Sequence, residues 1–235
     1  MTRLAIETST MTHSVAVERD GRVVAHRAVT RRAGHATTLL QSIEGCLEDA
    51  QTTKDELQAV LCGLGPGSFT GVRVGLAAAI GLGAGLGIPV GGVLSFYALL
   101  ATAPAQASVA IALDARKNEV YAGGWTALPD GRELIAPHTS SPDAFFRAVA
   151  AMRETEPILL LGDGPSAYPD AFAPYGDQIA WAPALQTPEA RHLFAAANHG
   201  LVSWKQDGIL EPLYIRPSDA ELNPRYAQPK ADAPK

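Results

Sequence analysis

The sequence predicts an α/β protein made of two lobes that repeat one order of strands and helices. Short apolar strands alternate with helical segments along the chain. The segment 108–125 (SVAIALDARKNEVYAGGW) also resembles the opening segment 3–19 (RLAIETSTMTHSVAVER), because each has a strand, an acid, a polar turn and a second strand. Alternation indicates packed layers of sheet and helix, and the internal similarity indicates a duplication. We place the break between the lobes near residues 101–106.

The first lobe is expected to run in the order β-β-β-α-β-α-β. Asp20-Gly21 separates two β-rich stretches, which is a strong hairpin signal. Apolar residues then recur at spacings of three and four, which predicts a helix over 36–50. The remaining elements are a first strand at 3–10, a buried strand at 57–65, a small-residue helix at 70–87 and a strand at 88–95.

The second lobe repeats this order more weakly. After the strand pair at 108–125 we expect a helix over 143–153, a strand over 157–164 that echoes AVLCGLGPG, and a last amphipathic helix over 188–203. The predicted domains are therefore a first lobe at 1–103 and a smaller, degenerate second lobe at 104–216. The proline-rich tail 217–235 lacks periodicity and is expected to be disordered.

Composition excludes several classes of protein. A net charge of −5 on 235 residues argues against independent nucleic-acid binding, which needs a concentrated basic face. Two cysteines are too few for a disulfide framework. The stretch 74–113 has no charge, but Pro89 and the glycines at 81, 83, 85, 87, 91 and 92 favour a buried helix and strand over a membrane span. Without a secretory signal, we expect a soluble, cytoplasmic protein.

The stretch 62–75, CGLGPGSFTGVRVG, is the most conspicuous motif. It lacks the lysine of a P-loop, the last glycine of a dinucleotide fingerprint and the first glycine of a nucleophile elbow. A structural turn that starts a close-packing helix is the preferred interpretation, and a phosphate role stays open. If a nucleotide binds, we expect it at residues from this loop and from the acid-bearing turns: Thr8, Ser9, Thr10, Gly65, Gly67, Ser68 and Asp114.

No metal site or catalytic constellation is expected. None of the six histidines lies four residues from another, and His192 and His199 are two helical turns apart. Glu7 and Asp114 hold matching places in the two lobes and could face one cleft. The turn after Asp114 lacks the glycine and hydroxyl pair that would wrap a phosphate. A stand-alone ATP-binding kinase or ATPase therefore remains the alternative hypothesis.

Two helices of the first lobe are predicted to have a face made of small or uncharged residues. Gly75, Ala79, Gly83 and Gly87 recur every four residues, and interior helix glycines cost about 1 kcal/mol each relative to alanine. This row either packs on the protein's own sheet or lets a partner helix approach. One face of the helix at 36–50 also carries no charge: Thr37, Thr38, Gln41, Ser42 and Gly45. Together the two helices predict a helix-on-helix protein interface.

Five segments together resemble the TsaB family, also called YeaZ. They are LAIETSTMTHSVAV (4–17), GLGPGSFTGVRVGLAAAIGLGAGLGIPVGGVLS (63–95), ALDARKNEVYAG (112–123), LLGDG (160–164) and EPLYIR (211–216). The resemblance implies the duplicated, ribonuclease H-like fold of actin, Hsp70 and sugar kinases. It implies a non-catalytic subunit in the synthesis of threonylcarbamoyladenosine beside the tRNA anticodon. Glu7 stands where the family more often has Asp.

The resemblance also implies partners. A TsaB protein pairs with TsaD through helices of its first lobe, forms an ATP-hydrolysing complex with TsaE, and can form homodimers through the same helices. It would meet tRNA only within the complex and hold no tight cofactor, with ATP or ADP at the partner interface. TsaD has a metal-binding HxxxH, whereas this chain has Leu39 four residues after His35. We expect partner contacts from both helices: His35, Thr38, Leu39, Ser42, Val72, Arg73, Leu76, Ala79, Ile80 and Gly83.

Overall fold

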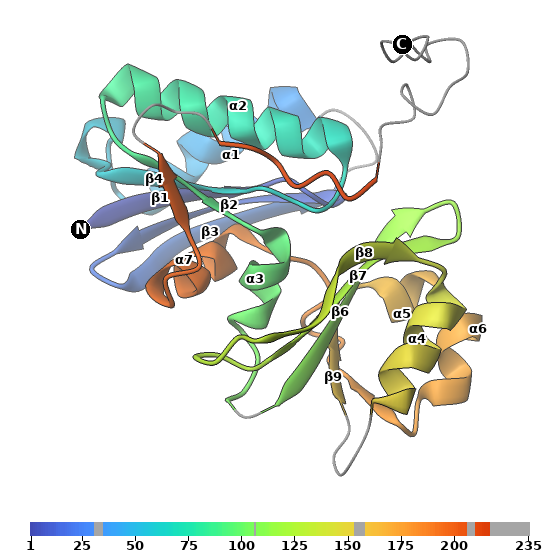
Figure 1. Cartoon of the computed structure of the whole chain (residues 1–235). Coiled ribbons are helices and arrows are strands. Elements are labelled where there is room, and N and C mark those ends of the chain that lie inside the picture. Colours follow the sequence, from blue (N-terminus) through green and yellow to red (C-terminus); the bar gives the residue numbers. More distant parts are fainter. Residues whose placement is uncertain (31–34, 106, 153–157, 206–209, 217–235) are drawn as a thin grey trace, which may run out of the picture.

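The computed structural model shows two lobes, each built on one twisted β-sheet (Figure 1). It describes residues 1–30, 35–105, 107–152, 158–205 and 210–216, without the side chains of 35–37. The predicted tail at 217–235 lies outside the described residues. Helix α3 (Ser95–Leu100) lies between the two sheets, and its buried Phe96, Leu99 and Leu100 pack on the second one.

The first sheet has six strands in the order β11-β5-β4-β1-β2-β3. The first three strands form an antiparallel meander, β4 and β5 lie parallel to β1, and β11 is antiparallel to β5. Asp20 and Gly21 both have positive φ at the predicted hairpin. The strands are β1 (Thr2–Glu7), β2 (Thr12–Arg19), β3 (Arg22–Thr30), β4 (Ala59–Gly63), β5 (Val90–Val93) and β11 (Ser203–Lys205).

The second sheet repeats this topology. Its order is β10-β9-β6-β7-β8, with an antiparallel meander and two strands parallel to its first strand. Without β11, the first sheet has the corresponding order β5-β4-β1-β2-β3, so the predicted duplication is confirmed. The strands are β6 (Ser108–Arg116), β7 (Glu119–Thr126), β8 (Glu133–Ser140), β9 (Ile158–Leu161) and β10 (Ile179–Trp181).

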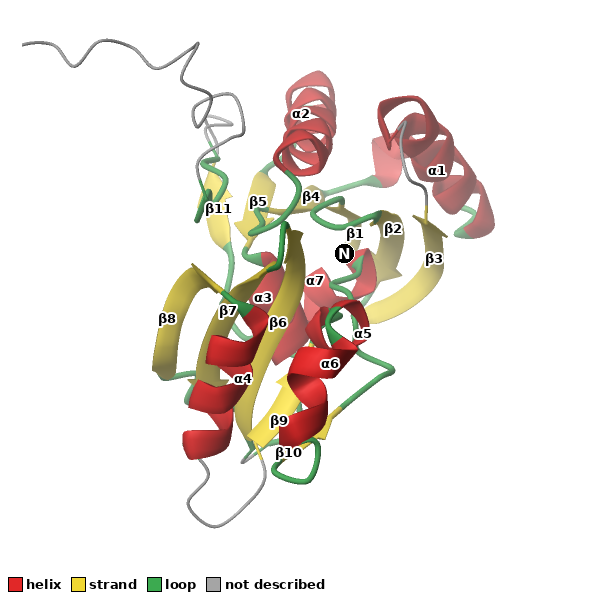
Figure 2. Ribbon diagram, turned by 90° about the vertical axis from the view of Figure 1, so that its right-hand side faces the viewer, coloured by secondary structure: helices red, strands yellow, loops and turns green. Residues whose placement is uncertain are grey.

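Helices cover both faces of the first sheet and one outer face of the second. Figure 2 shows α1 and α2 side by side on one face of the first sheet and α7 on the other. In the second lobe, α4, α5 and α6 cover the face that points away from α3. The helices are α1 (His35–Asp49), α2 (Phe69–Leu86), α4 (Pro142–Ala151), α5 (Gly164–Ala167), α6 (Pro169–Phe172), α7 (Ala190–Asn198) and the 3-10 turns Lys54–Glu56 and Ala173–Tyr175.

The predicted boundary of the second lobe is wrong at its C-terminal end. Helix α7 packs on β1, β2 and β4, and β11 extends the first sheet, so both belong to the first lobe. A buried ion pair between Arg3 and Glu18 reinforces this docking, because Arg3 Nη2 also donates to Asn198 Oδ1 at 2.9 Å. The predicted helix over 188–203 ends at Asn198, before Gly200 at φ +78°.

The small-residue row of α2 faces the protein's own sheet, so its assignment to a partner is wrong. Ala79 has no exposed surface, and Gly75 and Gly83 are buried. A Cβ at Gly75 would overlap Thr8 Oγ1, and one at Gly83 would overlap Val90 Cγ2. Glycine is needed here because the helix backbone lies directly on the sheet. The predicted partner residues Val72 and Leu76 are buried on the same side.

The predicted face of α1 is also only partly exposed. Ser42 and Gly45 are buried, and Ser42 Oγ hydrogen-bonds His13 Nε2 at 3.0 Å. Leu39 is buried in the core of the first lobe. The solvent side instead carries Leu40 and Gln41 together with the acidic Glu44 and Glu48. The solvent-facing side of α1 is therefore rotated about the helix axis relative to the predicted face.

Helix α2 is long and apolar enough to cross a membrane by length and composition alone. Its mean hydropathy is 1.5, and a third of the helix is buried in the fold. In this structure it covers one face of the first sheet, as predicted for the uncharged stretch 74–113.

The two faces of α2 predict opposite effects of one substitution. Gly81→Ala should raise the free energy of unfolding by about 0.5–1 kcal/mol, because its Cβ would meet open space and restrict the unfolded chain. Gly83→Ala should lower it by about 1–3 kcal/mol, because its Cβ overlaps Val90. Urea unfolding of both variants measures the difference, and equal effects would contradict the assigned helix orientation.

Candidate functional site

A cleft of about 610 Å³ separates the two lobes. One wall comes from the turns that follow β1 and β4, and the other from the β6–β7 hairpin and the loop after β9. The segment 213–216 crosses from one wall to the other. The lining residues used below are Ser9, Thr10, Gly67, Ser68, Phe69, Asp114, Arg116, Lys117, Tyr121, Asp163, Tyr214 and Arg216.

The structure brings together most of the predicted nucleotide residues. Ser9, Thr10, Gly67, Ser68 and Asp114 line the cleft, with residues from both lobes among them. Thr8 does not line it, because Thr8 Oγ1 donates to the Gly71 carbonyl at 2.8 Å and the side chain is buried under α2. Gly65 also lies outside the lining; it has φ +84° and its carbonyl accepts from Ser95 N.

The glycine loop is closed by the chain itself. Ser68 N donates to the Ser9 carbonyl at 2.6 Å, and Gly71 N donates to Ser68 Oγ, which caps α2. Gly67 must be glycine, since a Cβ there would overlap the Ser9 carbonyl oxygen. An amide that a phosphate would need is thus already paired with a carbonyl. The loop positions α2 against the β1 turn, as the structural interpretation predicted.

Glu7 is a buried anchor for this turn. Its carboxylate accepts from Ser9 N at 2.7 Å and from Ser95 Oγ at 2.9 Å, and Gly63 leaves room for it. Burial raises the pKa of Glu7 above its ordinary value of 4.5, and the hydrogen bonds from the two serines oppose that rise. Glu7 is fully buried and does not line the cleft, so it holds β1, the loop and α3 together.

Asp114 repeats the role of Glu7 on the second wall. Asp114 Oδ1 accepts from Arg116 N at 2.7 Å, two residues on, as Glu7 accepts from Ser9 N. Tyr168 OH also donates to Asp114 Oδ1 at 2.7 Å, and the Asp114 amide donates to Asp163 Oδ1 at 2.8 Å. Burial raises the pKa of Asp163. The two matching acids were predicted to share the cleft, but only Asp114 reaches it.

The hairpin between β6 and β7 presents two cations to the cleft mouth. Arg116, Lys117 and Asn118 have φ values of +59°, +53° and +59°. Only asparagine of these three adopts this region readily, so the turn is strained. The turn carries arginine and lysine in place of the glycine and hydroxyl groups that would wrap a phosphate.

The segment 210–216 ties the lobes together across the cleft. Leu213 N donates to the Leu64 carbonyl at 2.8 Å, and the Tyr214 ring packs on Phe69 with centroids 4.8 Å apart. Arg73 lies 3.7 Å from the centroid of the Phe69 ring, and its Nε donates to Tyr214 OH at 3.0 Å. On the second lobe, Arg216 pairs with Glu119 at 3.1 Å.

Sequence reasoning missed the residues that α1 and α2 expose. Leu40 is 60% exposed, and the solvent side of α2 carries Ala77, Gly81 and Ala84 without charge. The predicted Thr38, Arg73 and Ile80 keep some exposed surface, while the side chain of His35 lies outside the described part. The sequence does contain a pattern that could have indicated this surface. A second row of small residues, at 77, 81 and 85, runs parallel to the predicted row at 75, 79 and 83.

The described ranges contain neither a metal-binding cluster nor a reactive thiol. Within them no group of three or more His, Cys, Asp or Glu side chains is arranged to hold a metal ion. Burial raises the pKa of Cys46 to about 11 and raises that of Cys62 further, so neither thiol is a nucleophile at neutral pH.

Sequence comparisons relate the chain to one set of proteins. The family model for "TsaD: tRNA N6-adenosine threonylcarbamoyltransferase" matches residues 23–143. An uncharacterized protein of Mycobacterium tuberculosis is 33% identical over 225 residues, which covers 94% of each chain. The tRNA threonylcarbamoyladenosine biosynthesis protein TsaB of Haemophilus influenzae is 28% identical over 230 residues, covering 92% of this chain and 94% of that protein.

Solved structures agree with these sequence matches. YeaZ from Pseudomonas aeruginosa superposes with a TM-score of 0.70 at 27% identity, covering 91% of this chain and 99% of that one. Component A of (R)-2-hydroxyglutaryl-CoA dehydratase from Acidaminococcus fermentans shares the fold at 11% identity and a TM-score of 0.51, covering 86% and 97%. The predicted two-lobed fold of the actin, Hsp70 and sugar-kinase type is confirmed.

The buried carboxyl of Glu7 predicts a pH-dependent stability. With a raised pKa, native Glu7 keeps its proton at pH values where the unfolded chain has lost it. Its contribution to stability therefore falls as pH rises from about 4.5 through the raised native pKa. Glu7→Gln should remove this loss, so the variant gains stability relative to the wild type between pH 4.5 and neutral pH.

Thermal unfolding of the wild type and of Glu7→Gln across this pH range measures the difference between their stabilities. Other titrating groups, such as His192, affect both proteins equally and cancel in this difference. Glu7→Ala is the contrasting variant, since it leaves Ser9 N and Ser95 Oγ without their acceptor and should cost about 1–3 kcal/mol for each. A wild type that gains stability over Glu7→Gln as pH rises would contradict the assignment.

Proposed function

The chain belongs to the TsaB (YeaZ) family, and on that premise we propose that it is a non-catalytic subunit in tRNA threonylcarbamoyladenosine biosynthesis. It supports threonylcarbamoyl transfer to the adenosine beside the anticodon by pairing with TsaD, and TsaE joins that pair. The relatives with this role are bacterial proteins, and we place the activity in the cytoplasm.

One observation carries the pairing: a solvent-facing row of small, uncharged residues on α2 that lies beside the exposed Leu40 of α1. The two helices lie side by side on the same face of the first sheet (Figures 1 and 2). Helix α2 turns Ala77, Gly81 and Ala84 to solvent, and a Cβ at Gly81 would meet nothing within 4 Å. Leu40 of α1 is exposed on this surface. Small residues let another helix approach closely, and an exposed leucine can fill the partner's groove.

The partner surface keeps only part of the predicted set. Thr38, Arg73 and Ile80 stay in it because they retain exposed surface. Val72, Leu76, Ala79 and Gly83 leave it because they pack on the sheet. Homodimers would use the same helices, so self-association and pairing with TsaD would exclude each other.

The residues of the cleft give little support to the alternative hypothesis of a stand-alone kinase or ATPase. The amide of Ser68 is paired with Ser9, and Thr8 is held by α2. Glu7 is buried beneath the loop and cannot reach a magnesium–phosphate group in the cleft. We therefore place any ATP or ADP at the partner interface, and we propose no tightly bound cofactor.

The pairing surface predicts that Gly81→Arg abolishes co-purification with TsaD, while the isolated chain keeps its circular dichroism spectrum and melts at the wild-type temperature or above it. The guanidinium would enter a helix-on-helix interface without a partner charge, which costs several kcal/mol. Gln178→Arg, which adds one charge at an exposed site of the second lobe, is the matched control and should pair normally. Gly83→Arg should unfold the chain.

A tRNA modification assay with purified TsaD and TsaE tests the function itself. Threonylcarbamoyladenosine should form with the wild type and with Gln178→Arg, and its yield should fall to the level without this chain for Gly81→Arg. A Gly81→Arg protein that still pairs and supports modification would place the interface elsewhere. No dependence of the yield on this chain would overturn the proposed function.

A further inference from the structure

We propose that the mouth of the interlobe cleft is an RNA-binding surface that holds an unpaired nucleotide of the tRNA bound by the complex. This inference rests on the proposed function, because it assigns a substrate contact to this subunit. The carrying observation is a set of cations and aromatic rings that line the cleft: Arg116, Lys117, Phe69, Tyr121 and Tyr214. Arg73 lies behind them, packed on the Phe69 ring.

The cations come from a turn that its local sequence does not favour. The β6–β7 hairpin places Arg116 and Lys117 at positive φ, although the β2–β3 hairpin uses Asp20-Gly21 for the same kind of turn at little cost. A strained turn persists when the surrounding structure supports it, and here Asp114 Oδ1 accepts from Arg116 N. Both side chains line the cleft, where they can meet phosphates.

The rings form a preorganised stacking platform. Arg73 lies 3.7 Å from the centroid of the Phe69 ring and is hydrogen-bonded to Tyr214 OH, so the Tyr214 ring is fixed in place before any ligand arrives. Tyr214 remains 41% exposed. An exposed, immobilised ring beside arginines is the arrangement on which unpaired bases stack. Tyr121 OH donates to the Gly67 carbonyl at 3.3 Å and holds the opposite wall.

Two acids, Asp114 and Asp163, line the cleft together with these cations. Asp114 Oδ1 accepts from Tyr168 OH and Arg116 N, and Asp163 Oδ1 accepts from the Asp114 amide, while Glu119 pairs with Arg216. In the described ranges no ion pair joins the Arg116 guanidinium to a carboxylate. A free nucleotide would need phosphate contacts at the glycine loop, where Ser9 already occupies the Ser68 amide. A polymer can place its phosphates at the mouth instead, so the geometry favours RNA.

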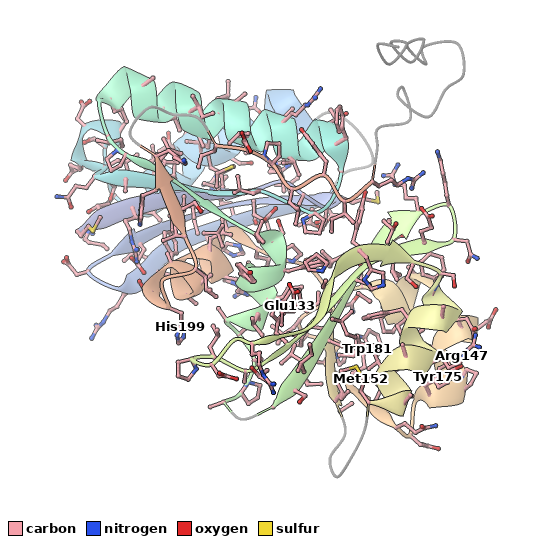
Figure 3. The ribbon with its side chains drawn as sticks, viewed as in Figure 1. Glu133, Arg147, Met152, Tyr175, Trp181 and His199 are labelled. Carbon is pink, nitrogen blue, oxygen red and sulfur yellow. The ribbon has the colours of Figure 1, made fainter. Side chains whose placement is uncertain are left out.

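Binding of an unmodified tRNA transcript to the complex with TsaD tests the cations. Arg116→Gly/Lys117→Gly should weaken binding about tenfold and reduce the slope of log affinity against log salt by about one for each cation removed. The double variant should melt at the wild-type temperature or above it, since glycine suits the positive φ at both sites. Arg147→Ala is the matched control, because Arg147 is exposed on α4 at the outer side of the second lobe (Figure 3).

A second set of variants tests the stacking platform. Tyr214→Leu should weaken tRNA binding with an unchanged salt slope, because it removes a ring and no charge. Tyr214→Phe keeps the ring and should bind within about twofold of the wild type. A 4-thiouridine-containing transcript should crosslink to the wild-type chain in the complex, and the Arg116→Gly/Lys117→Gly variant should lose that crosslink.

The outcomes separate this inference from the proposed function. Wild-type affinity and salt slope in the Arg116→Gly/Lys117→Gly complex, with pairing to TsaD intact, would overturn the RNA surface and leave the subunit role standing. Loss of the crosslink when millimolar ATP is added before irradiation would identify the cleft as a free-nucleotide site and would also overturn the RNA surface. Failure of the wild-type chain to pair with TsaD would instead count against the proposed function, and the RNA surface would then be rejected as a contact within that complex.

Discussion

The hydrogen bond from Ser68 N to the Ser9 carbonyl is the contact on which the rest of the molecule depends. It joins the turn after β1 to the start of α2, and Gly67 allows the backbones to meet. Because this contact sets where α2 begins, it also sets which face of the helix lies on the sheet. The same bond fills a position that a phosphate would otherwise take. One backbone contact thus closes the cleft floor and orients the outer helix.

The buried carboxylate of Glu7 makes that arrangement rigid. It holds the Ser9 amide and the Ser95 hydroxyl, which lie at the cleft turn and at the start of α3. Helix α3 in turn lies between the two sheets. Its buried Phe96 packs on Trp125 of the second sheet, with the two ring centroids 5.4 Å apart. A chain of short contacts therefore runs from the first turn to the second lobe. Movement of the lobes would have to break it, together with the crossing segment 210–216.

Much of the fold follows from local sequence, because periodicity and turn chemistry are local properties. The Asp20-Gly21 hairpin, the strand–turn–helix at the glycine loop and the repeated strand order were predictable in this way. Which small residues of α2 face inward was not, because rows at 75, 79, 83 and at 77, 81, 85 have the same spacing and both lack charge. Only the crossing of α2 over Thr8 and Val90 distinguishes them. That α7 and β11 pack on the first lobe is likewise decided by contacts between residues far apart in the sequence, which local patterns do not reveal.

The duplication explains how one fold can place two different surfaces on a single subunit. In each lobe the first strand ends in an acid that accepts the amide two residues on, Glu7 from Ser9 and Asp114 from Arg116. In the first lobe that acid is buried and its turn packs under α2, which leaves α2 free to present its other face. In the second lobe the acid stays at the cleft, and the turn extends outward with arginine and lysine. The same hydrogen bond therefore supports a packed scaffold on one side and a charged, strained hairpin on the other. The two lobes thus keep the same hydrogen bond between an acid and the amide two residues on, and they differ in the residues that surround it.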